Sequence, residues 1–440
     1  MRSLIIFWLL LLGVWVPALS HAGTQDGRCD LQIITSYPES FYRPFLEFFS
    51  RDHPRICVTN KNTIALMRHV REGRRPIADV IWASSPVAFA ALDAEGLLDH
   101  RPDLALDRSR FNGLAVDAEN GAYFGFALSQ IGLMWKPDGE RTGPDADIRV
   151  LAQDRYRNRI GMTSPARSGT THLFVETVLQ NAGWENGWAL LSRLGGNLAT
   201  VTARSFGVRE GIVRNRFELG IGIDFLAKAA NGDQSNIAFA PLNNSAIFPA
   251  SVGITRAGAD NMRAADFIRF LRSDAGQNLL LRPAIARIPI DRKLWKQVGF
   301  EYEPGASIHF DAALAARRLP IVNVLFDEMI TYRYLELADI RTGIERLSGH
   351  LESADDPQLR KLIAEAHGKV EAVPVASFMS DAEELISQLQ EGEPAELSAD
   401  AQGTLRNSWS HDFSSRYSRA RELVARGEAR LAELSRGRAK

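Results

Sequence analysis

The chain has 440 residues, which is more than one ordinary domain usually needs. Its 52 basic and 53 acidic side chains leave a formal net charge of −1, so it lacks the basic excess of a nucleic-acid-binding protein. Hydrophobic residues make up 45% of the sequence, an ordinary content for a globular protein, and most of the chain is therefore expected to fold.

The first 22 residues have the features of a secretory signal peptide. Arg2 gives a positive start, the uncharged apolar run Leu4–Val16 follows, and Ser20–Ala22 supplies small residues for cleavage. The apolar run is shorter than the roughly 20 residues that a membrane span needs. We therefore expect residues 1–22 to be a signal peptide and the protein to be secreted to the periplasm, with an uncleaved membrane anchor as the alternative.

From Asp30 onward the sequence alternates between strand and helix patterns. The runs Asp30–Thr35, Ile56–Asn60 and Ala78–Ala83 are rich in β-forming residues, and Glu39–Ser50 and Ile64–Arg71 between them have helical spacing. Such alternation predicts a parallel sheet with right-handed crossovers. In these sheets ligands bind beyond the carboxyl ends of the strands.

Two pairs of hydroxyl residues follow the first and third of these strands. Ser36 and Tyr37 come after the first, and Ser84 and Ser85 come after the third. Hydroxyl groups at strand ends suit an anion that approaches backbone N–H groups. The alternative is that serine occurs here only as an ordinary turn residue.

The two cysteines, Cys29 and Cys57, each precede or begin a predicted parallel strand, so both are expected at the same end of one sheet. Secretion permits a disulfide, but the sequence alone cannot fix the Cα separation, and the bridge stays an open possibility. Two cysteines without clustered histidines make a poor metal site. We expect no metal and no cofactor.

A second α/β unit follows a long, nearly uncharged segment, Phe124–Trp135, which suits a strand crossing between two lobes as a hinge. In this unit His172–Gln180 has a helical pattern. Strands are expected at Ile160–Thr163, Thr200–Thr202, Leu219–Asp224 and Ile237–Ala240. The segment Ile288–Ile290 is expected to return to the first lobe.

The chain becomes helical toward its C-terminus, first at Ala265–Leu271 and Ala275–Leu281 and then throughout from about Pro320. A seam of apolar residues at alternating spacings of three and four suggests either a coiled coil or, as we favour, a helix that packs on its own chain. This seam consists of Phe413, Tyr417, Ala420, Val424, Gly427, Leu431 and Leu434.

The clearest local motif is Ser168–His172, SGTTH, between a predicted strand and a predicted helix. The first N–H groups of a helix have no intrahelical partner, and the helix dipole is positive there. Gly169 allows close approach of the backbone, and Ser168, Thr170 and Thr171 add hydroxyls, so the motif predicts an anion site. Simple N-capping is the alternative. The motif lacks the ending of a nucleotide-binding P-loop.

Two further strand ends carry candidate ligand residues. Arg204 and Ser205 follow the strand at Thr200–Thr202 and offer a guanidinium, a hydroxyl and backbone donors, although arginine is often simply a surface charge. Asp224 ends a glycine-rich strand, where its carboxylate can accept bonds from ligand hydroxyls or cap the next helix.

Enzyme motifs are missing from the sequence. Neither the G-x-S-x-G elbow nor the H-E-x-x-H zinc helix occurs, and the nine histidines form no cluster. His172 and Glu176 share a helix face, a pairing that is more often structural than catalytic. We therefore expect a binding protein, not an enzyme.

Several of these segments, in order, resemble the periplasmic binding proteins for phosphorylated metabolites, of the sugar-phosphate and phosphoglycerate transport regulatory type. That family is part of the ferric-iron-type class of type II periplasmic binding proteins. The resemblance covers roughly Asp30 to Glu336. It is carried by IITSYPESFYRPF, VIWASSP, SPARSGTTHLFVETVLQNAGWENGWALLSRLGGN, TARSFGVREG, LGIGIDF, PASVGITRAGADN and IVNVLFDEMIT.

The resemblance implies an α/β protein of two lobes that close on a ligand at a hinge. It implies a first lobe at 23–125, a second lobe at 126–245 and a return to the first lobe at 246–320. The signal peptide at 1–22 precedes these parts, and a helical extension at 321–440 follows them. Together with the strand-end argument it assigns ligand contacts to Ser36, Tyr37, Ser84, Ser85, Ser168, Gly169, Thr170, Thr171, Arg204, Ser205 and Asp224.

The family also implies the ligand and the partner. The expected ligand is a small phosphorylated organic anion, and the expected partner is a membrane permease of an ABC importer or a sensor kinase of a two-component system. Ferric iron is the alternative ligand, but its binders use adjacent tyrosines and several anionic oxygens, and no two tyrosines are adjacent here. Arg209 stands where the family usually has proline. A structural or adhesion protein would instead lack ligand chemistry in a cleft.

Overall fold

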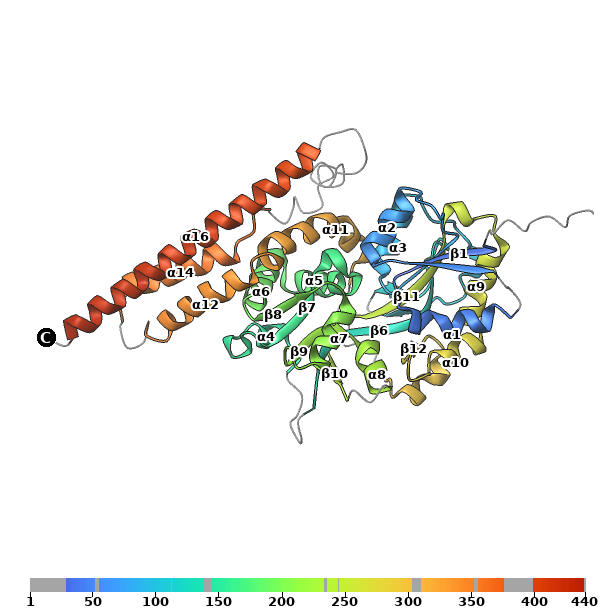
Figure 1. Ribbon diagram of the computed structural model, residues 1–440, viewed down its shortest axis with the longest axis horizontal. Helices are drawn as coiled ribbons and strands as arrows, with labels where there is room; N and C mark the ends of the chain where they lie inside the picture. Colours follow the sequence, from blue (N-terminus) through green and yellow to red (C-terminus); the bar gives the residue numbers. More distant parts are fainter. Residues whose placement is uncertain are drawn as a thin grey trace, which may run out of the picture.

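A computed structural model describes residues 29–51, 55–111, 113–137, 145–232, 236–243, 245–302, 310–351, 355–375 and 399–438. The predicted signal peptide, residues 1–22, lies outside these ranges. Figure 1 shows two α/β lobes side by side, with a group of helices attached to the far side of the second lobe. Within the described ranges, no helix has the length and apolar character needed to cross a membrane.

The first lobe forms as the alternation of strand and helix patterns predicted. Its strand β1 lies between β2 and β3, and both pairs are parallel. All five residues of β1 are buried because helices cover both faces of the sheet. The elements are β1 (Leu31–Thr35), α1 (Glu39–Phe49), β2 (Ile56–Asn60), α2 (Thr63–Arg71), β3 (Val80–Ala83) and α3 (Pro86–Ala94).

Two long central strands, β6 (Phe124–Trp135) and β11 (Ile247–Ile254), join the lobes. The sheet order is β2-β1-β3-β11-β6-β9-β7-β8, so β6 and β11 stand between the parallel strands of the two lobes. Strand β11 is antiparallel to both β3 and β6, so β3 and β6 run in the same direction. Strand β9 is antiparallel to β6. The parallel strands of the two lobes therefore run toward each other, and their carboxyl ends face a common space.

The second lobe has three parallel strands, in the order β9-β7-β8. Each strand leads into a helix that begins at the end facing the first lobe. The strands are β7 (Ile160–Thr163), β8 (Leu198–Thr202) and β9 (Leu219–Ile223). The helices that follow these strands are α5 (Gly169–Ala182), α7 (Ser205–Val213) and α8 (Asp224–Gly232), and α6 (Trp184–Gly195) follows α5.

After β11 the chain returns to the first lobe, where α9 and α10 pack near α1 and β12 pairs with β6. Shorter elements complete the body. They are β4 (Arg110–Phe111), β5 (Leu114–Ala115), α4 (Ile148–Leu151), β10 (Ala238–Pro241), α9 (Met262–Arg272), α10 (Asp274–Leu279) and β12 (Ile288–Pro289), with 3₁₀ turns at Pro102–Leu104, Asp154–Tyr156, Pro165–Arg167, Arg256–Gly258 and Arg292–Val298.

A disulfide joins Cys29 and Cys57, whose Cα atoms lie 5.7 Å apart. It connects the residues at the starts of β1 and β2, two strands that pair in parallel. The bridge that the sequence left open is therefore present in the structure. It closes a loop across a sequence separation of 28 residues, which by the chain-entropy model stabilises the fold by about 3–4 kcal/mol.

The helical extension begins with α11, which starts at Ala312, before the predicted boundary. Pro320 lies inside this helix. A π-helical turn follows at Asp327–Thr331. The remaining helices are α12 (Tyr334–Ser348), α14 (Pro357–Glu371) and α16 (Ala399–Arg438).

The apolar seam of α16 packs on α12 and α14, so it serves the chain's own fold, as we favoured. Phe413, Tyr417 and Ala420 are fully buried, and the Tyr417 hydroxyl donates to the carbonyl of Met329 at 2.8 Å. Helix α14 packs in turn on α6 of the second lobe. The extension is therefore part of the folded body.

Helix α11 contacts both lobes, packing on α3 of the first and on α5 of the second. On α5, His172 and Glu176 face it and are completely buried. His172 Nε2 donates to the carbonyl of Ala315 at 3.1 Å, and Gln180 donates to Glu176 at 3.1 Å. Burial lowers the pKa of His172 to about 4 and raises the pKa of Glu176 to about 7. This pair has a packing role, as the sequence indicated.

Replacing Phe413 by alanine is expected to destabilise the protein by about 3–5 kcal/mol, because the ring is fully buried in the seam and its loss leaves a cavity. Arg426→Ala, on the exposed side of the same helix, is the control and is expected to change stability by less than about 0.5 kcal/mol. Urea unfolding of both variants measures the difference. Equal stabilities would show that α16 does not pack as described.

Glu176 is expected to make stability depend on pH. The unfolded chain loses this proton near pH 4.5 and the folded protein near pH 7, so the stabilisation is complete below 4.5 and is lost as the pH rises to 7. Glu176→Gln cannot lose a proton. We therefore expect variant and wild type to be similar at pH 4.5 and the variant to be more stable by about 3 kcal/mol at pH 7. Urea unfolding of both proteins from pH 4.5 to pH 7 tests this expected difference. Any contribution from protonation of His172 is common to both proteins.

Candidate functional site

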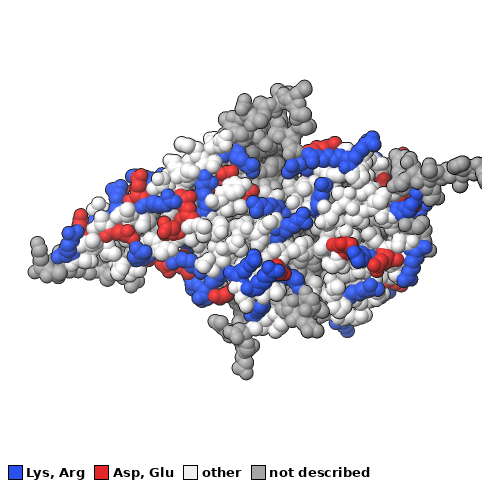
Figure 2. Space-filling model, viewed as in Figure 1, with Lys and Arg blue, Asp and Glu red and all other residues white. Residues whose placement is uncertain are grey.

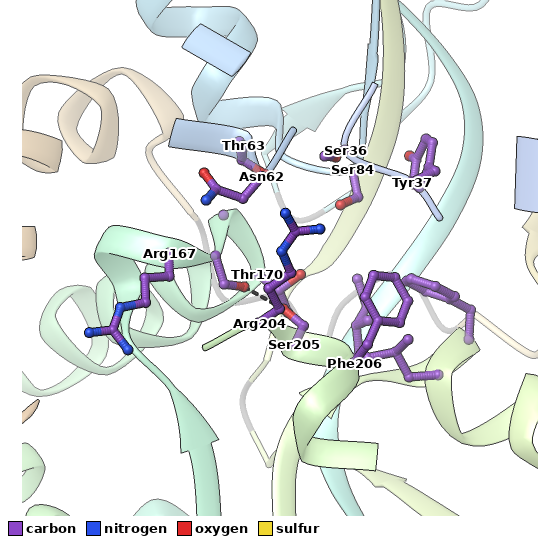
Figure 3. A pocket seen from close by; sticks show the side chains of 15 residues that line it. Ser36, Tyr37, Asn62, Thr63, Ser84, Arg167, Thr170, Arg204, Ser205 and Phe206 are labelled. Atoms are coloured by element: carbon purple, nitrogen blue, oxygen red, sulfur yellow. Dashed lines mark hydrogen bonds between the residues drawn. The ribbon is translucent and has the colours of Figure 1, made fainter. Parts of the chain in front are cut away.

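A cleft lies where the carboxyl ends of the strands from the two lobes face each other (Figure 3). It contains about 510 Å³ of space outside protein atoms, part of it open to solvent. Residues of the first lobe form one wall and residues of the second lobe form the other. The lining consists of Ser36, Tyr37, Asn62, Thr63, Ser84, Arg167, Ser168, Gly169, Thr170, Arg204, Ser205, Phe206, Ile223, Phe225 and Leu226.

Helix N-termini surround this cleft. Helices α2, α5, α7 and α8 begin at or beside lining residues, and α1 and α3 begin within two residues of Tyr37 and Ser84. Each N-terminus carries a partial positive charge and N–H groups without intrahelical partners. Among the residues that the structure describes, the lining includes Arg167 and Arg204 but no aspartate or glutamate. The cleft therefore favours an anion.

This preference is local. Basic and acidic side chains are interspersed over the face of the molecule seen in Figure 2, in keeping with the net charge of −1. Attraction of an anion must therefore come from the geometry of the cleft and not from a field of the whole protein.

Ser168 caps helix α5. Its hydroxyl accepts from the N–H of Thr171 at 3.2 Å and bonds with the hydroxyl of Ser205 at 2.7 Å. The capping interpretation of this serine is thus correct, and its bond to Ser205 holds the starts of α5 and α7 together. The first N–H groups of α5, on Gly169 and Thr170, lie beside it in the lining.

Gly169 lies where the two lobes touch. A Cβ atom added there would lie 2.8 Å from the Cβ of Ser85 and 3.0 Å from the side chain of Thr63, both in the first lobe. A larger residue would therefore push the lobes apart. The structure thus has the two walls of the cleft in contact at this point.

Arg204 extends from the second lobe toward Ser84 on the opposite wall (Figure 3). It precedes the first residue of α7 and does not cap that helix with its side chain. Its guanidinium is therefore positioned to contact a group held between the lobes. Arg167 points away from the centre of the cleft in the same view.

One end of the cleft is apolar. Tyr37, Phe206 and Phe225 supply rings, and Ile223 and Leu226 supply aliphatic side chains. The Tyr37 side chain is 1% exposed, and burial raises the pKa of its hydroxyl to about 12, so the phenol is neutral. The cleft thus combines a polar, electropositive region with an apolar one.

Eight of the eleven predicted ligand residues line the cleft. The other three, Ser85, Thr171 and Asp224, are buried next to it. Asp224 Oδ1 accepts from the N–H of the next residue, Phe225, at 2.8 Å. Burial raises the pKa of Asp224.

The sequence argument missed other lining residues. Asn62 and Thr63 follow β2 just as Ser36 follows β1, so the strand-end rule could have found them. Phe206 and Phe225 follow residues that were predicted, and their apolar side chains gave no sign of a ligand role. Arg167 lies just before Ser168, and its positive charge could have marked it in the sequence as a candidate anion ligand.

Comparisons with known proteins agree with this architecture. The model of the bacterial extracellular solute-binding protein family matches residues 48–282. The phosphoglycerate transport regulatory protein PgtC of Salmonella typhimurium is 29% identical over 346 residues, which is 76% of this chain and 82% of that protein. The protein of the same name from Salmonella typhi matches equally.

Solved structures share the fold. The periplasmic binding protein AfuA from Actinobacillus pleuropneumoniae, with fructose-6-phosphate bound, has a TM-score of 0.58 at 15% identity, covering 68% of this chain and 97% of that one. The ferric binding protein from Campylobacter jejuni has a TM-score of 0.56 at 14% identity, covering 67% and 98%. The predicted two-lobed α/β fold is confirmed. The chain belongs to the bacterial extracellular solute-binding protein family.

Proposed function

We propose that this protein captures a small phosphorylated organic anion between its lobes and presents it to a membrane protein. The observation that carries the proposal is the meeting of several helix N-termini and Arg204 on one cleft, whose described lining residues include no acidic side chain. Helix N-termini bind phosphate well because their N–H groups and their dipoles act together. AfuA, which shares the fold, was solved with fructose-6-phosphate, and PgtC is named for phosphoglycerate transport.

In this proposal the phosphate lies at the start of α5. The N–H groups of Gly169 and Thr170 and the hydroxyls of Thr170 and Ser205 donate to it, and Arg204 adds charge from the same wall. Ser84 and Asn62 close from the first lobe. Because both walls then contact the same anion, the ligand has greater affinity for the closed form and shifts the equilibrium between open and closed lobes.

Ferric iron fits the lining less well. Hard Fe(III) needs several anionic oxygen ligands. Tyr37 is the one tyrosine among the described lining residues, and its hydroxyl stays neutral at physiological pH. These described residues include no carboxylate. The ferric binding proteins among the solved structures therefore support the fold but not an iron site in this chain.

Binding without catalysis is the better proposal. Within the part of the chain that the structure describes, the lining offers hydroxyls but no histidine or carboxylate to act as a general base for them. His172, the histidine nearest in sequence to a lining residue, is buried against α11. The relatives reported above are named as binding and transport regulatory proteins.

The partner is proposed to be a membrane protein facing the periplasm, either an importer permease or a sensor kinase. The family is extracellular, and residues 1–22 have the pattern of a signal peptide. The helical extension and the regulatory name of PgtC favour the sensor kinase. A neighbouring gene for a histidine kinase would support that partner, and genes for an ATPase and a permease would support the importer.

Melting temperatures with a panel of compounds test the ligand class. Phosphorylated sugars and phosphoglycerates are expected to raise the melting temperature, because a ligand at a hundredfold excess over its Kd stabilises the folded state by about 2.7 kcal/mol. The matching sugars without phosphate are expected to leave it unchanged. A shift with ferric citrate alone, or with none of the compounds, would refute the phosphate site.

Thr170→Val is expected to weaken binding of the best phosphorylated compound by about tenfold or more, because it removes a donor to an anion while keeping the shape of the side chain. Thr177→Val, on the same helix but with its hydroxyl bonded to the carbonyl of Leu173, is the control and should leave affinity unchanged. Isothermal titration calorimetry measures both. Equal affinities of the two variants would exclude Thr170 from the site.

A further inference from the structure

The turn between α11 and α12 brings the helical extension next to the cleft. It is a π-helical turn, Asp327–Thr331, and all five of its residues are buried. Turns of this kind are rare and frequently occur at functional sites. The ligand chemistry proposed above does not use this one, so its place beside the cleft calls for another explanation.

Asp327, the first residue of the turn, connects the cleft to the surface of the extension. Its Oδ1 accepts from the hydroxyl of Ser164 at 2.6 Å, and both side chains are buried. Ser164 begins the loop that leads to Ser168, and Arg167 in this loop lines the cleft. The carbonyl of Asp327 accepts from the N–H of Tyr332 at 3.0 Å. One residue therefore holds the cleft loop through its side chain and Tyr332 through its backbone.

Two large side chains are exposed just after this turn. Tyr332 is 56% exposed and Leu335 is 68% exposed, and they stand three residues apart at the start of α12. Among the described residues, the other exposed large apolar side chains all belong to separate segments of the first lobe. A single exposed apolar residue needs no explanation, but a pair beside the cleft loop suggests a contact with another molecule.

The charges exposed around this pair are positive. Partial burial raises the pKa of the Tyr332 hydroxyl, and the charges of Asp327, Arg406, Glu328 and Arg167 also act on that hydroxyl, so these groups lie around it. The two acidic side chains are 3% and 4% exposed. Arg406 belongs to α16 and pairs with Glu328 at 3.5 Å, yet its own side chain is 49% exposed. The outward charge beside Tyr332 is therefore that of the two arginines.

Arg167 belongs to this surface more than to the ligand site. It lines the cleft, but its side chain points away from the centre of the cleft (Figure 3). Its guanidinium has no ion-pair or hydrogen-bond partner among the residues that the structure describes. A charge directed outward and left unpaired suits a group on another molecule. We define the junction surface as Tyr332, Leu335, Arg167 and Arg406.

We propose that the junction surface is the docking site for an acidic segment of the membrane protein that receives the ligand. This inference rests on the function proposed above and names the surface that the partner contacts. Its two arginines attract the carboxylates of the segment, and its tyrosine and leucine bury apolar side chains of the same segment, a combination typical of interface hot spots. Because Asp327 holds this surface to the loop before Ser168, ligand and partner bind to neighbouring residues of one loop.

Site-specific cross-linking in cells of the source bacterium tests the docking site. The photoreactive residue p-benzoylphenylalanine replaces Tyr332 or Leu335 in the full chain and, as the control, Met262, which is 82% exposed on α9 of the first lobe. Positions 332 and 335 are expected to cross-link to an acidic periplasmic peptide of a permease or sensor kinase, as identified by mass spectrometry. Cross-links to a second copy, to this chain itself or to a peptide without acidic residues would overturn the proposal. Equal cross-linking from position 262, or none from 332 and 335, would do the same.

A pair of opposite charges at one exposed position tests the acidic character of the partner. Leu335→Asp and Leu335→Lys both remove the leucine, but only aspartate repels an acidic segment. Cross-linking from position 332 is expected to fall by about tenfold or more in Leu335→Asp and by less than about threefold in Leu335→Lys. An acidic residue in the first turn of a helix is favourable, so Leu335→Asp is expected to fold. Equal losses in the two variants, or no loss in either, would overturn the proposal.

Purified proteins separate this proposal from the previous one. Because Leu335 lies outside the cleft lining, both variants are expected to bind the best phosphorylated compound as tightly as wild type. If the melting temperature shows that Leu335→Asp does not fold, Arg406→Gln replaces it and is expected to lower cross-linking about threefold or more. Unchanged cross-linking would overturn the proposal. Wild-type protein that binds a phosphorylated compound but gives no cross-link refutes only the docking site, whereas wild-type protein that binds no phosphorylated compound refutes the proposed function itself.

Discussion

The direction of β6 is the constraint on which the rest of the structure depends. Strand β6 runs out of the first lobe and into the second, and β9, its neighbour in the second lobe, runs the opposite way. The parallel strands of both lobes therefore end at one cleft, and each is followed by a helix start. Partial charges that are small at any one helix add at this place. A chain with almost no net charge thus obtains a strongly anion-favouring site.

The same arrangement connects the cleft to the helical extension. Helices α3 and α5 begin beside Ser84 and Gly169, on opposite walls, and both pack on α11. In the proposed change between open and closed lobes, α3 would move relative to α5, and α11 would then lose or rearrange its contacts with one of them. Beyond α11, α12 and α14 pack on α16 and on the second lobe. The cleft and the extension are therefore joined by continuous packing through α11.

The sequence predicted the fold better than the side chains of the site. The strand patterns at β2, β6 and β7 gave the observed bounds, because alternation and uncharged runs follow from burial. The strand-end rule found Ser36, Ser84 and Arg204, but it could not say which way each neighbour points. Ser85 and Asp224 are therefore buried beside the cleft and do not line it, although they are adjacent to lining residues. Contacts between distant segments set those directions.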